Sequence, residues 1–213
     1  MNDIIDKLKR VRRGAMFIIE GPSTGKGAVC KEILAQDEHI KFSVSVTTRP
    51  KRDTEVEDID YHFISDAEYD KLKAEDAFYE CVDSQYGARY GTLRSDVGED
   101  VLFDMDWAGA RQMKAKAPDD VVTIYLLPPS IAELKRRLYG RGTDSEEVIK
   151  KRMSQFPDKV SHWKEFDYVL LNVNLEETVY KVQKIISAER MKRVRQTGLA
   201  EFVEHLLTEA QHG

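Results

Sequence analysis

The sequence has little cysteine, no long apolar run and no excess of positive charge, and each absence excludes a class of protein. Only Cys30 and Cys81 occur among 213 residues, in no metal-ligand spacing. This argues against a disulfide scaffold and is typical of a reducing compartment. No apolar run approaches the length of a membrane span, and the N-terminal residues lack the apolar centre of a secretory signal. We therefore expect a cytoplasmic protein without a membrane-spanning segment.

The charge balance excludes a further class. Lysine and arginine number 33 and aspartate and glutamate 38, which gives a formal net charge of −5 at pH 7. A protein that coats nucleic acid needs a basic surface, so we expect no nucleic-acid partner. With 41% hydrophobic and 33% charged residues, the chain fits one large folded domain with its own core. An anionic small molecule would have to be held by local clusters of cations.

Short apolar runs indicate the strands. They lack polar–apolar alternation, which is typical of strands buried on both faces. Helical patterns follow most of them, and this order predicts a parallel α/β sheet with covered faces. The runs are 15–19, 101–103, 121–127 and 168–171, with a weaker one at 40–46, and the helical patterns are 29–35, 108–115, 131–138 and 176–188.

Three regions depart from this alternation. Residues 60–92 are rich in Tyr, Phe, Gly and acidic residues and show little helical pattern, which indicates a small inserted β-rich subdomain. A further helix starts at 146–155, and Pro157 is expected to bend or end it. After residue 189 the chain turns basic and finishes with an amphipathic stretch, 199–207. Its periodicity fits packing on the same subunit and packing in a homodimer equally well.

Residues 17–27 have the order of a phosphate-binding loop. Three apolar residues lead into a turn of Gly, Pro, Ser and Thr, and Gly25-Lys26 opens a helical pattern. A strand, a glycine turn and a helix start in succession aim backbone N–H groups and a lysine at a polyphosphate. The segment therefore predicts a nucleotide site.

The loop departs in two ways from the usual pattern G-x-x-x-x-G-K-[ST]. Only three residues separate its two glycines, and Gly27 and Ala28 follow the lysine. A shorter loop has one fewer backbone donor, and a glycine after the lysine removes the hydroxyl that usually binds Mg²⁺ beside the phosphates. Ser23 or Thr24 could supply a hydroxyl instead.

A basic segment lies at the end of the weak strand. Residues 43–52 combine hydroxyl groups with three cations. Arg49 and Arg52 suit a phosphate because a guanidinium offers a planar fork to two oxygens. In isolation such a segment is more often a solvated basic turn, but its neighbours in the sequence change that interpretation.

The motifs occur in the order found in one family. Ser43-Val-Ser-Val-Thr-Thr-Arg-Pro-Lys-Arg52 is followed by Asp60-Tyr-His-Phe63, Phe78-Tyr-Glu80, Tyr90-Gly-Thr92, Val101-Leu-Phe-Asp-Met-Asp106, Leu126-Leu-Pro-Pro-Ser130, Leu138-Tyr-Gly-Arg-Gly-Thr143, Arg152 and Asp167-Tyr-Val-Leu-Leu-Asn172. In this order the sequence resembles guanylate kinase from about residue 14 to residue 188. The basic helical tail resembles the extension of some bacterial members.

The resemblance implies a fold and a division of the chain. The fold is the α/β P-loop NTPase three-layer sandwich, with a parallel central sheet, a small inserted β-rich nucleotide-binding subdomain and a helical lid. A single guanylate kinase-like domain would span 1–213, with the core at about 14–49, 93–136 and 160–188, the GMP-binding subdomain at about 50–92, the lid at about 137–159 and a C-terminal helical extension at about 189–213.

The resemblance also implies the reaction ATP + GMP ⇌ ADP + GDP. Guanine presents N1–H and an amine on one edge and a carbonyl at O6. Glu80 would accept both N–H groups, and Ser45 or Thr92 would donate to O6. Asp106 is the second carboxylate expected near the amine. A site built on such hydrogen bonds can reject adenine by about 10⁴-fold.

Other matched positions would hold the phosphates. The phosphate of GMP is expected at Arg49, Arg52, Tyr61 and Tyr90. Positions expected to bind ATP are Gly21, Pro22, Ser23, Thr24, Gly25, Lys26, Gly27 and Asn172.

Phosphoryl transfer depends mainly on positioning and on neutralising charge, so cations are the expected catalytic groups. They are Lys26, Arg49, Arg137, Arg141 and Arg152, of which the last three belong to the lid by resemblance. Mg²⁺ would accompany ATP, and Asp104 would orient water bound to it.

The acceptor side matches the family better than the donor side. Besides the short loop, the connection 92–100 is several residues shorter than the helix-containing one usually found there. Three functions therefore compete: an active guanylate kinase, a catalytically weakened relative that binds GMP as a regulator, and a protein-interaction module on the same fold. The retained lid arginines and Glu80 favour an enzyme over an interaction module.

Overall fold

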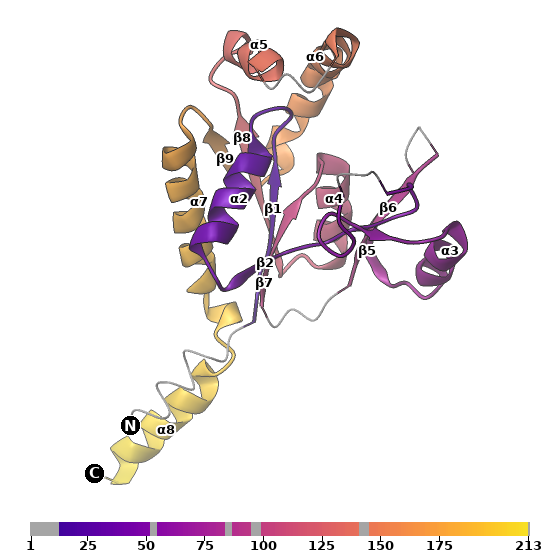
Figure 1. The fold of residues 1–213 in the computed structure, drawn as a ribbon. Coiled ribbons are helices and arrows are strands. Elements are labelled where there is room, and N and C mark those ends of the chain that lie inside the picture. Colours follow the sequence, from indigo (N-terminus) through magenta and orange to yellow (C-terminus); the bar gives the residue numbers. More distant parts are fainter. Residues whose placement is uncertain (1–12, 52–54, 84–86, 95–98, 141–144, 213) are drawn as a thin grey trace.

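A five-stranded parallel sheet lies between two layers of helices (Figure 1). The computed structural model describes residues 13–51, 55–83, 87–94, 99–140 and 145–212. The strands run in the order β2 (Ile40–Phe42), β7 (Asp100–Asp104), β1 (Met16–Glu20), β8 (Val121–Leu127) and β9 (Tyr168–Leu171). All neighbouring pairs are parallel, so the predicted parallel α/β fold is confirmed.

Both faces of the central strands β1 and β8 are covered, which explains why these strands lack alternation. The edge strand β9 differs, because Val169 and Leu171 are exposed on one face. In β1, Phe17 and Ile19 pack against α2 (Lys26–Gln36) and α7 (Leu175–Arg190). Met16 and Ile18 point to the other face, where they pack in the same cluster as α4 (Trp107–Lys116). Because successive strand residues alternate between the faces, a strand with two covered faces is apolar throughout.

A second sheet stands beside the first. Its order is β4 (His62–Phe63), β3 (Val46–Thr47), β6 (Arg89–Leu93) and β5 (Phe78–Asp83). Tyr79 of β5 packs in the cluster that lies under α4, so α4 joins the two sheets. The expected β-rich region is therefore present.

The expectation of a single strand at 40–46 is wrong. The segment divides into β2, which belongs to the parallel sheet, and β3, which belongs to the second sheet. Between them, the Ser43 N–H still donates to the Leu102 carbonyl of β7 at 2.9 Å. The chain thus leaves one sheet and enters the other within a few residues, which a pattern of apolar residues does not reveal.

The expectation of little helix in 60–92 is also wrong, because α3 (Asp66–Ala74) lies within it. The Ser65 hydroxyl accepts from the Glu68 N–H at 3.2 Å, and Ser and Glu at this spacing form a capping-box sequence. Tyr69 of α3 is fully buried against Phe78, with ring centroids 5.0 Å apart. The capping signal was present in the sequence and predicts this helix.

Pro157 does not end the helix that contains it. α6 runs from Glu146 to Ser161. A proline in a helix interior costs about 3 kcal/mol because one hydrogen bond is lost. Here Pro157 is exposed, while Ile149 and Phe156 are buried against α5 (Ile131–Gly140). Burial of these residues before the proline, and packing of the partly buried Val160 after it, offset this cost, so the helix continues past Pro157.

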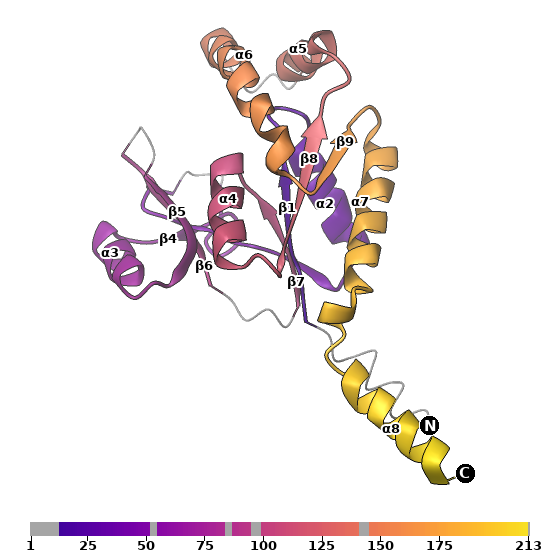
Figure 2. The same cartoon turned by 180° about the vertical axis from the view of Figure 1, so that it is seen from behind.

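The C-terminal segment leaves the sheet at its lower edge. After α7 come the short 3₁₀ helix η2 (Arg193–Arg195) and α8 (Leu199–His212), which projects away from both sheets (Figures 1 and 2). Arg195 is 2% exposed and donates to the Gly14 carbonyl at 2.8 Å. Val203, Leu206 and Leu207 of α8 are exposed. Within the described ranges, every helix is too short or too polar to cross a bilayer.

Candidate active site

The carboxyl ends of β1 and β7 bring three charged side chains together. The Lys26 ammonium, at the start of α2, lies 2.6 Å from Asp104 Oδ1 and 3.0 Å from Glu20 Oε2. Glu20 ends β1 and Asp104 ends β7, and these strands are neighbours in the sheet. Ligands of open parallel sheets bind at this edge, where the sequence predicted Lys26 and Asp104.

The pKa values in this cluster reflect burial and mutual charge. Burial raises the pKa of Glu20, and the charge of Lys26 offsets only part of that effect. Burial alone would lower the pKa of Lys26, but the charges of Glu20 and Asp104 outweigh it and raise the pKa. Lys26 therefore carries its positive charge at neutral pH.

The loop before Lys26 has a distinct backbone shape. Ser23 has φ 58° and Gly25 has φ 94°, a left-handed conformation that favours glycine and strains serine. The Thr24 hydroxyl donates to the Gly21 carbonyl at 3.0 Å and closes the turn. Among the described residues, no side chain caps the N-terminus of α2, so its first N–H groups face the loop opening, as an anion site requires.

The carbonyl of Thr24 is held from outside the loop. Asn172, directly after β9, donates to it from its side-chain amide at 2.7 Å, and Arg137 of α5 donates at 3.1 Å. Thr178 donates to the other side-chain atom of Asn172, its Oδ1, at 2.9 Å. Asn172 and Arg137 were both predicted as site residues, and here both support the loop.

A cavity of about 440 Å³ adjoins this support. It opens beside the start of α2, at the ends of β9 and α5. Its lining includes Thr24, Gly25, Ala28, Arg136, Arg137, Asn172 and Val173. It lies beside the loop 21–27, where ATP is expected, and is large enough to take a nucleobase.

Gly27 stands next to the Asp104 carboxylate. A Cβ built on Gly27 would lie 3.9 Å from Asp104 Oδ2, which is ordinary contact. The hydroxyl that the loop lacks would therefore belong beside Asp104. Carboxylate oxygens are ligands that Mg²⁺ prefers, so Asp104 suits a metal site at this point.

A second buried carboxylate lies in the small sheet. Glu80 of β5 is 8% exposed and accepts from the Thr92 hydroxyl of β6 at 3.2 Å. Burial raises the pKa of Glu80 to about 7, despite that hydrogen bond. A Cβ on Gly109 of α4 would lie 3.3 Å from the Glu80 side chain, so α4 packs closely against this carboxylate.

Asp106 links the Glu80–Thr92 pair to the lysine cluster. It follows β7, and its side chain caps α4 by accepting from the Gly109 N–H at 3.0 Å. Its charge acts on the pKa of both Glu80 and Glu20. Asp106 therefore lies two residues after Asp104 of the lysine cluster, and the helix that it caps packs against Glu80.

A cation with two tyrosines lies farther along the small sheet. Arg49 makes two bonds to Glu55, at 2.6 and 3.0 Å, and lies over the Tyr61 ring at 5.6 Å. The Tyr61 and Tyr90 rings are 5.9 Å apart. Bonding to Glu55 raises the pKa of Arg49, and burial raises the pKa of Tyr61. The three predicted phosphate ligands thus form one group.

Two further predicted residues, Ser45 and Arg152, lie within the described part of the chain. Ser45 lies before β3, where its carbonyl accepts from the His62 N–H at 2.9 Å. Arg152 is exposed on α6. Arg52 and Arg141 lie outside the described residues.

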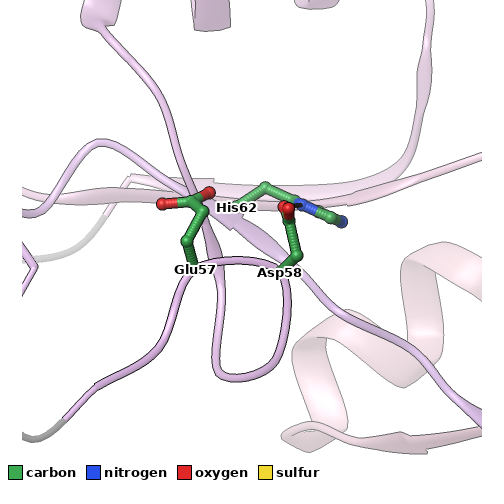
Figure 3. Close-up of side chains that lie close together, drawn as sticks. All are labelled: Glu57, Asp58 and His62. Atoms are coloured by element: carbon green, nitrogen blue, oxygen red, sulfur yellow. Dashed lines mark hydrogen bonds and ion pairs between the residues drawn. The ribbon is translucent and has the colours of Figure 1, made fainter.

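Glu57, Asp58 and His62 form a group near Tyr61 whose potential ligand atoms lie within 4.8 Å of one another (Figure 3). Figure 3 shows the Asp58 carboxylate directed at the His62 ring, and the two are 2.7 Å apart. The Glu57 carboxylate accepts from the Phe63 N–H at 3.0 Å. These bonds shape the turn before β4, and we assign the group to that turn.

Sequence reasoning missed two residues at the site. Glu20 lies within the segment 17–27, but its position beside Lys26 depends on how the loop folds back. Glu55 follows Arg49 by six residues and gives no periodic signal. The only sequence hint for either residue is that it lies close in the chain to a predicted phosphate ligand.

Comparison with known proteins identifies the family. A family model described as guanylate kinase matches residues 13–189. The chain belongs to the guanylate kinase family. The guanylate kinase of Zymomonas mobilis subsp. mobilis is 49% identical over 203 residues, which cover 92% of this chain and 94% of that protein. The guanylate kinase of Novosphingobium aromaticivorans is 46% identical, with 92% and 91% covered.

A solved structure supports the same assignment. The crystal structure of guanylate kinase from Anaplasma phagocytophilum matches with a TM-score of 0.70 and 33% identity, over 91% of this chain and 95% of that one. The P-loop NTPase fold expected from the resemblance is therefore confirmed. The match to the family model ends at residue 189, so η2 and α8 lie beyond that match.

Proposed function

We propose that the protein transfers the γ-phosphoryl group of ATP to GMP. The observation that carries the proposal is that Asp106 follows Asp104, which pairs with Lys26, and caps α4 at Gly109, which packs against the buried Glu80. Two nucleotides bound at Lys26 and at Glu80 would meet at the carboxyl edge of the sheet. Guanylate kinase activity of the relatives supports the same conclusion.

The acceptor base would bind at Glu80. An ionised carboxylate accepts both N–H groups on the guanine edge, whereas adenine would leave it without a donor in a buried pocket. Thr92, which donates to Glu80 here, holds that carboxylate in place. Ser45 is the remaining hydroxyl for O6, and Asp106 is the second carboxylate near the amine.

The acceptor phosphate would bind at Arg49, Arg52, Tyr61 and Tyr90. Arg49 is already ordered by Glu55 and by the Tyr61 ring. A guanidinium fixed in advance loses less freedom when it binds an anion. Glu55 therefore acts as the residue that aims Arg49.

The donor would bind at the loop 21–27. The triphosphate would take the free N–H groups at the start of α2, and Lys26 would contact its β- and γ-phosphates. The adenine would occupy the cavity beside Asn172 and Arg137. In this arrangement Asn172 and Arg137 position the loop rather than contact the reacting atoms.

Mg²⁺ fits the donor side, because the Asp104 carboxylate faces the space beside Gly27. When bound, the ion would neutralise charge on the phosphates. Asp104 would hold it through water, and Lys26 would steer the γ-phosphoryl group toward the acceptor. Arg152 of α6, with Arg141, would supply further positive charge from the lid at about 137–159, and 50–92 would form the GMP-binding subdomain.

A coupled assay for ADP tests the proposal. The protein with ATP and Mg²⁺ is expected to turn over GMP and to leave AMP and UMP nearly unchanged. GMP binding without turnover would instead indicate a nucleotide-binding regulator. Absence of both would leave an interaction module, which the pairing of Glu80 with Thr92 does not favour.

A further inference from the structure

Glu20 holds groups that a bound phosphate would need. The residue is 2% exposed. Its carboxylate accepts from the Lys26 ammonium at 3.0 Å, and the adjacent backbone N–H of Gly21 favours its charged form by lowering its pKa. A lysine and a loop N–H are the donors that such loops offer to phosphate. The carboxylate of Glu20 is therefore an anion already bound at the loop.

The local charge is negative as a result. Lys26 faces both Glu20 and Asp104, so two negative charges flank one positive charge. The next charge acting on Glu20, that of Asp106, is also negative. Metal-free ATP carries more negative charge than its complex with a divalent cation. The cluster should therefore repel free ATP more strongly than metal-bound ATP.

Lys26 cannot leave this cluster without consequence. If the ammonium moved to a phosphate, Glu20 would remain buried without its cation, which is strongly unfavourable. A divalent cation brought in with the phosphates would restore the balance of charge, and free ATP would not.

We propose that Glu20 is a specificity-determining residue that makes the loop reject metal-free ATP and accept the metal complex. This role rests on the proposed function, because it takes ATP as the donor nucleotide. It also gives the short loop a substitute for the selectivity that a metal-binding hydroxyl would confer.

Calorimetric titration of the full chain tests this role without any turnover. ATP is titrated once with EDTA and once with excess Mg²⁺, into the parent and into Glu20→Gln. Removing one charge near the phosphates should tighten the binding of metal-free ATP by about tenfold and affect Mg-ATP much less. The ratio of the two Kd values should fall accordingly. An unchanged ratio, or weaker binding of metal-free ATP, overturns the proposal.

Three variants control for fold and for general charge. Glu20→Asp keeps the charge and should keep the parent ratio. Glu32→Gln removes the same charge from α2, where the carboxylate bonds Gln36 at 3.3 Å, and should also keep it. If thermal unfolding shows that Glu20→Gln does not fold, Glu20→Ser replaces it. A lowered ratio in Glu32→Gln would point to net charge alone and count against Glu20.

GMP separates this proposal from the proposed function. GMP is expected to bind at Glu80, so Glu20→Gln should bind it as the parent does. If the parent phosphorylates GMP and Glu20→Gln leaves the ATP ratio unchanged, only the role of Glu20 is wrong. If the parent binds neither GMP nor ATP, both proposals fail.

Discussion

The side-chain amide of Asn172 donates a 2.7 Å hydrogen bond to the carbonyl of Thr24, which lies 148 positions earlier in the chain. This bond ties the end of β9 to the phosphate-binding loop. Thr178 holds Asn172 in turn, through a 2.9 Å bond to its Oδ1. The conformation of a loop with one residue fewer than usual thus depends on a residue at the far edge of the sheet.

Asn172→Ala should loosen the loop. Its loss leaves the Thr178 hydroxyl without its acceptor and removes one of two donors from the Thr24 carbonyl, so the free energy of unfolding should fall by about 1–3 kcal/mol. ATP should bind more weakly and GMP as before. Denaturant unfolding and calorimetry measure these effects. An ATP Kd equal to that of the parent would show that the bond does not shape the loop, and Thr178→Val should give a smaller effect in the same direction.

Gly27→Ser should restore the missing hydroxyl. The added Cβ fits, because its nearest neighbour, Asp104 Oδ2, would be 3.9 Å away. We expect turnover at limiting Mg²⁺ to rise by about tenfold, the size of effect seen for groups that orient a metal. Gly27→Ala is the matched control: it should raise the free energy of unfolding by about 0.5–1 kcal/mol through helix propensity and leave the Mg²⁺ dependence unchanged. Equal kinetics for the two variants would contradict the placement of the metal.

Lys26→Met should abolish turnover and also destabilise the fold. Removing the ammonium leaves Glu20 buried without its cation, at a cost of about 3 kcal/mol. GMP affinity should stay nearly the same. Adding Glu20→Gln to Lys26→Met should recover most of the lost stability but none of the activity. Thermal unfolding and the coupled assay separate the two effects. If Lys26→Met alone were as stable as the parent, the buried charge of Glu20 would not need Lys26.

Glu80→Gln should relax the choice of base. The amide still accepts one N–H of guanine but presents its own N–H to the other, so GMP should bind at least tenfold more weakly, as expected when a buried polar group loses its partner. The Michaelis constant for GMP should rise more than turnover falls. The preference for GMP over AMP should narrow in the same assay. Unaltered GMP binding in this variant would show that Glu80 does not bind guanine.

The raised pKa of Glu80 predicts two pH effects. Because its pKa is about 7 in the folded protein and 4.5 in its ordinary range, the unfolded chain releases the proton first as pH rises. The stability of the fold therefore falls as pH rises from 4.5 to about 7 and stays lowered above that, by at most about 3 kcal/mol. GMP binding, which needs the ionised form, should strengthen as pH rises through about 7.

Comparison with Glu80→Gln isolates both pH effects. The difference in unfolding free energy between parent and variant should change from pH 5 to pH 8, in favour of the variant at the higher pH. The GMP Kd of the variant should lack the pH dependence that is expected for the parent. If the unfolding free energy depends on pH in the same way in both proteins, Glu80 is ionised over this whole pH range.

Local signals were sufficient where the relevant neighbours are close in sequence. The apolar runs of β1 and β8 predicted a parallel sheet, since a strand with two covered faces has no polar side. The expectation of two buried faces was wrong for β9, where Val169 and Leu171 are exposed. Lys26, Asp104, Glu80 and Thr92 were predicted as site residues from motif order. The helix α3 was missed although Ser65 and Glu68 carry a capping signal, and α6 was expected to bend or end at Pro157, because propensity does not register the packing of Phe156.

The sequence by itself determined the alternation of strands and helices in the core and the family, and it predicted which residues read the base, because these depend on local patterns and on matched motifs. Only the tertiary structure decided that 40–46 divides between two sheets, that Glu20 is buried against Lys26 and that Asn172 supports Thr24. Each of these is a contact whose energy comes from burial or hydrogen bonding between segments that the chain brings together only on folding. No single segment contains that information.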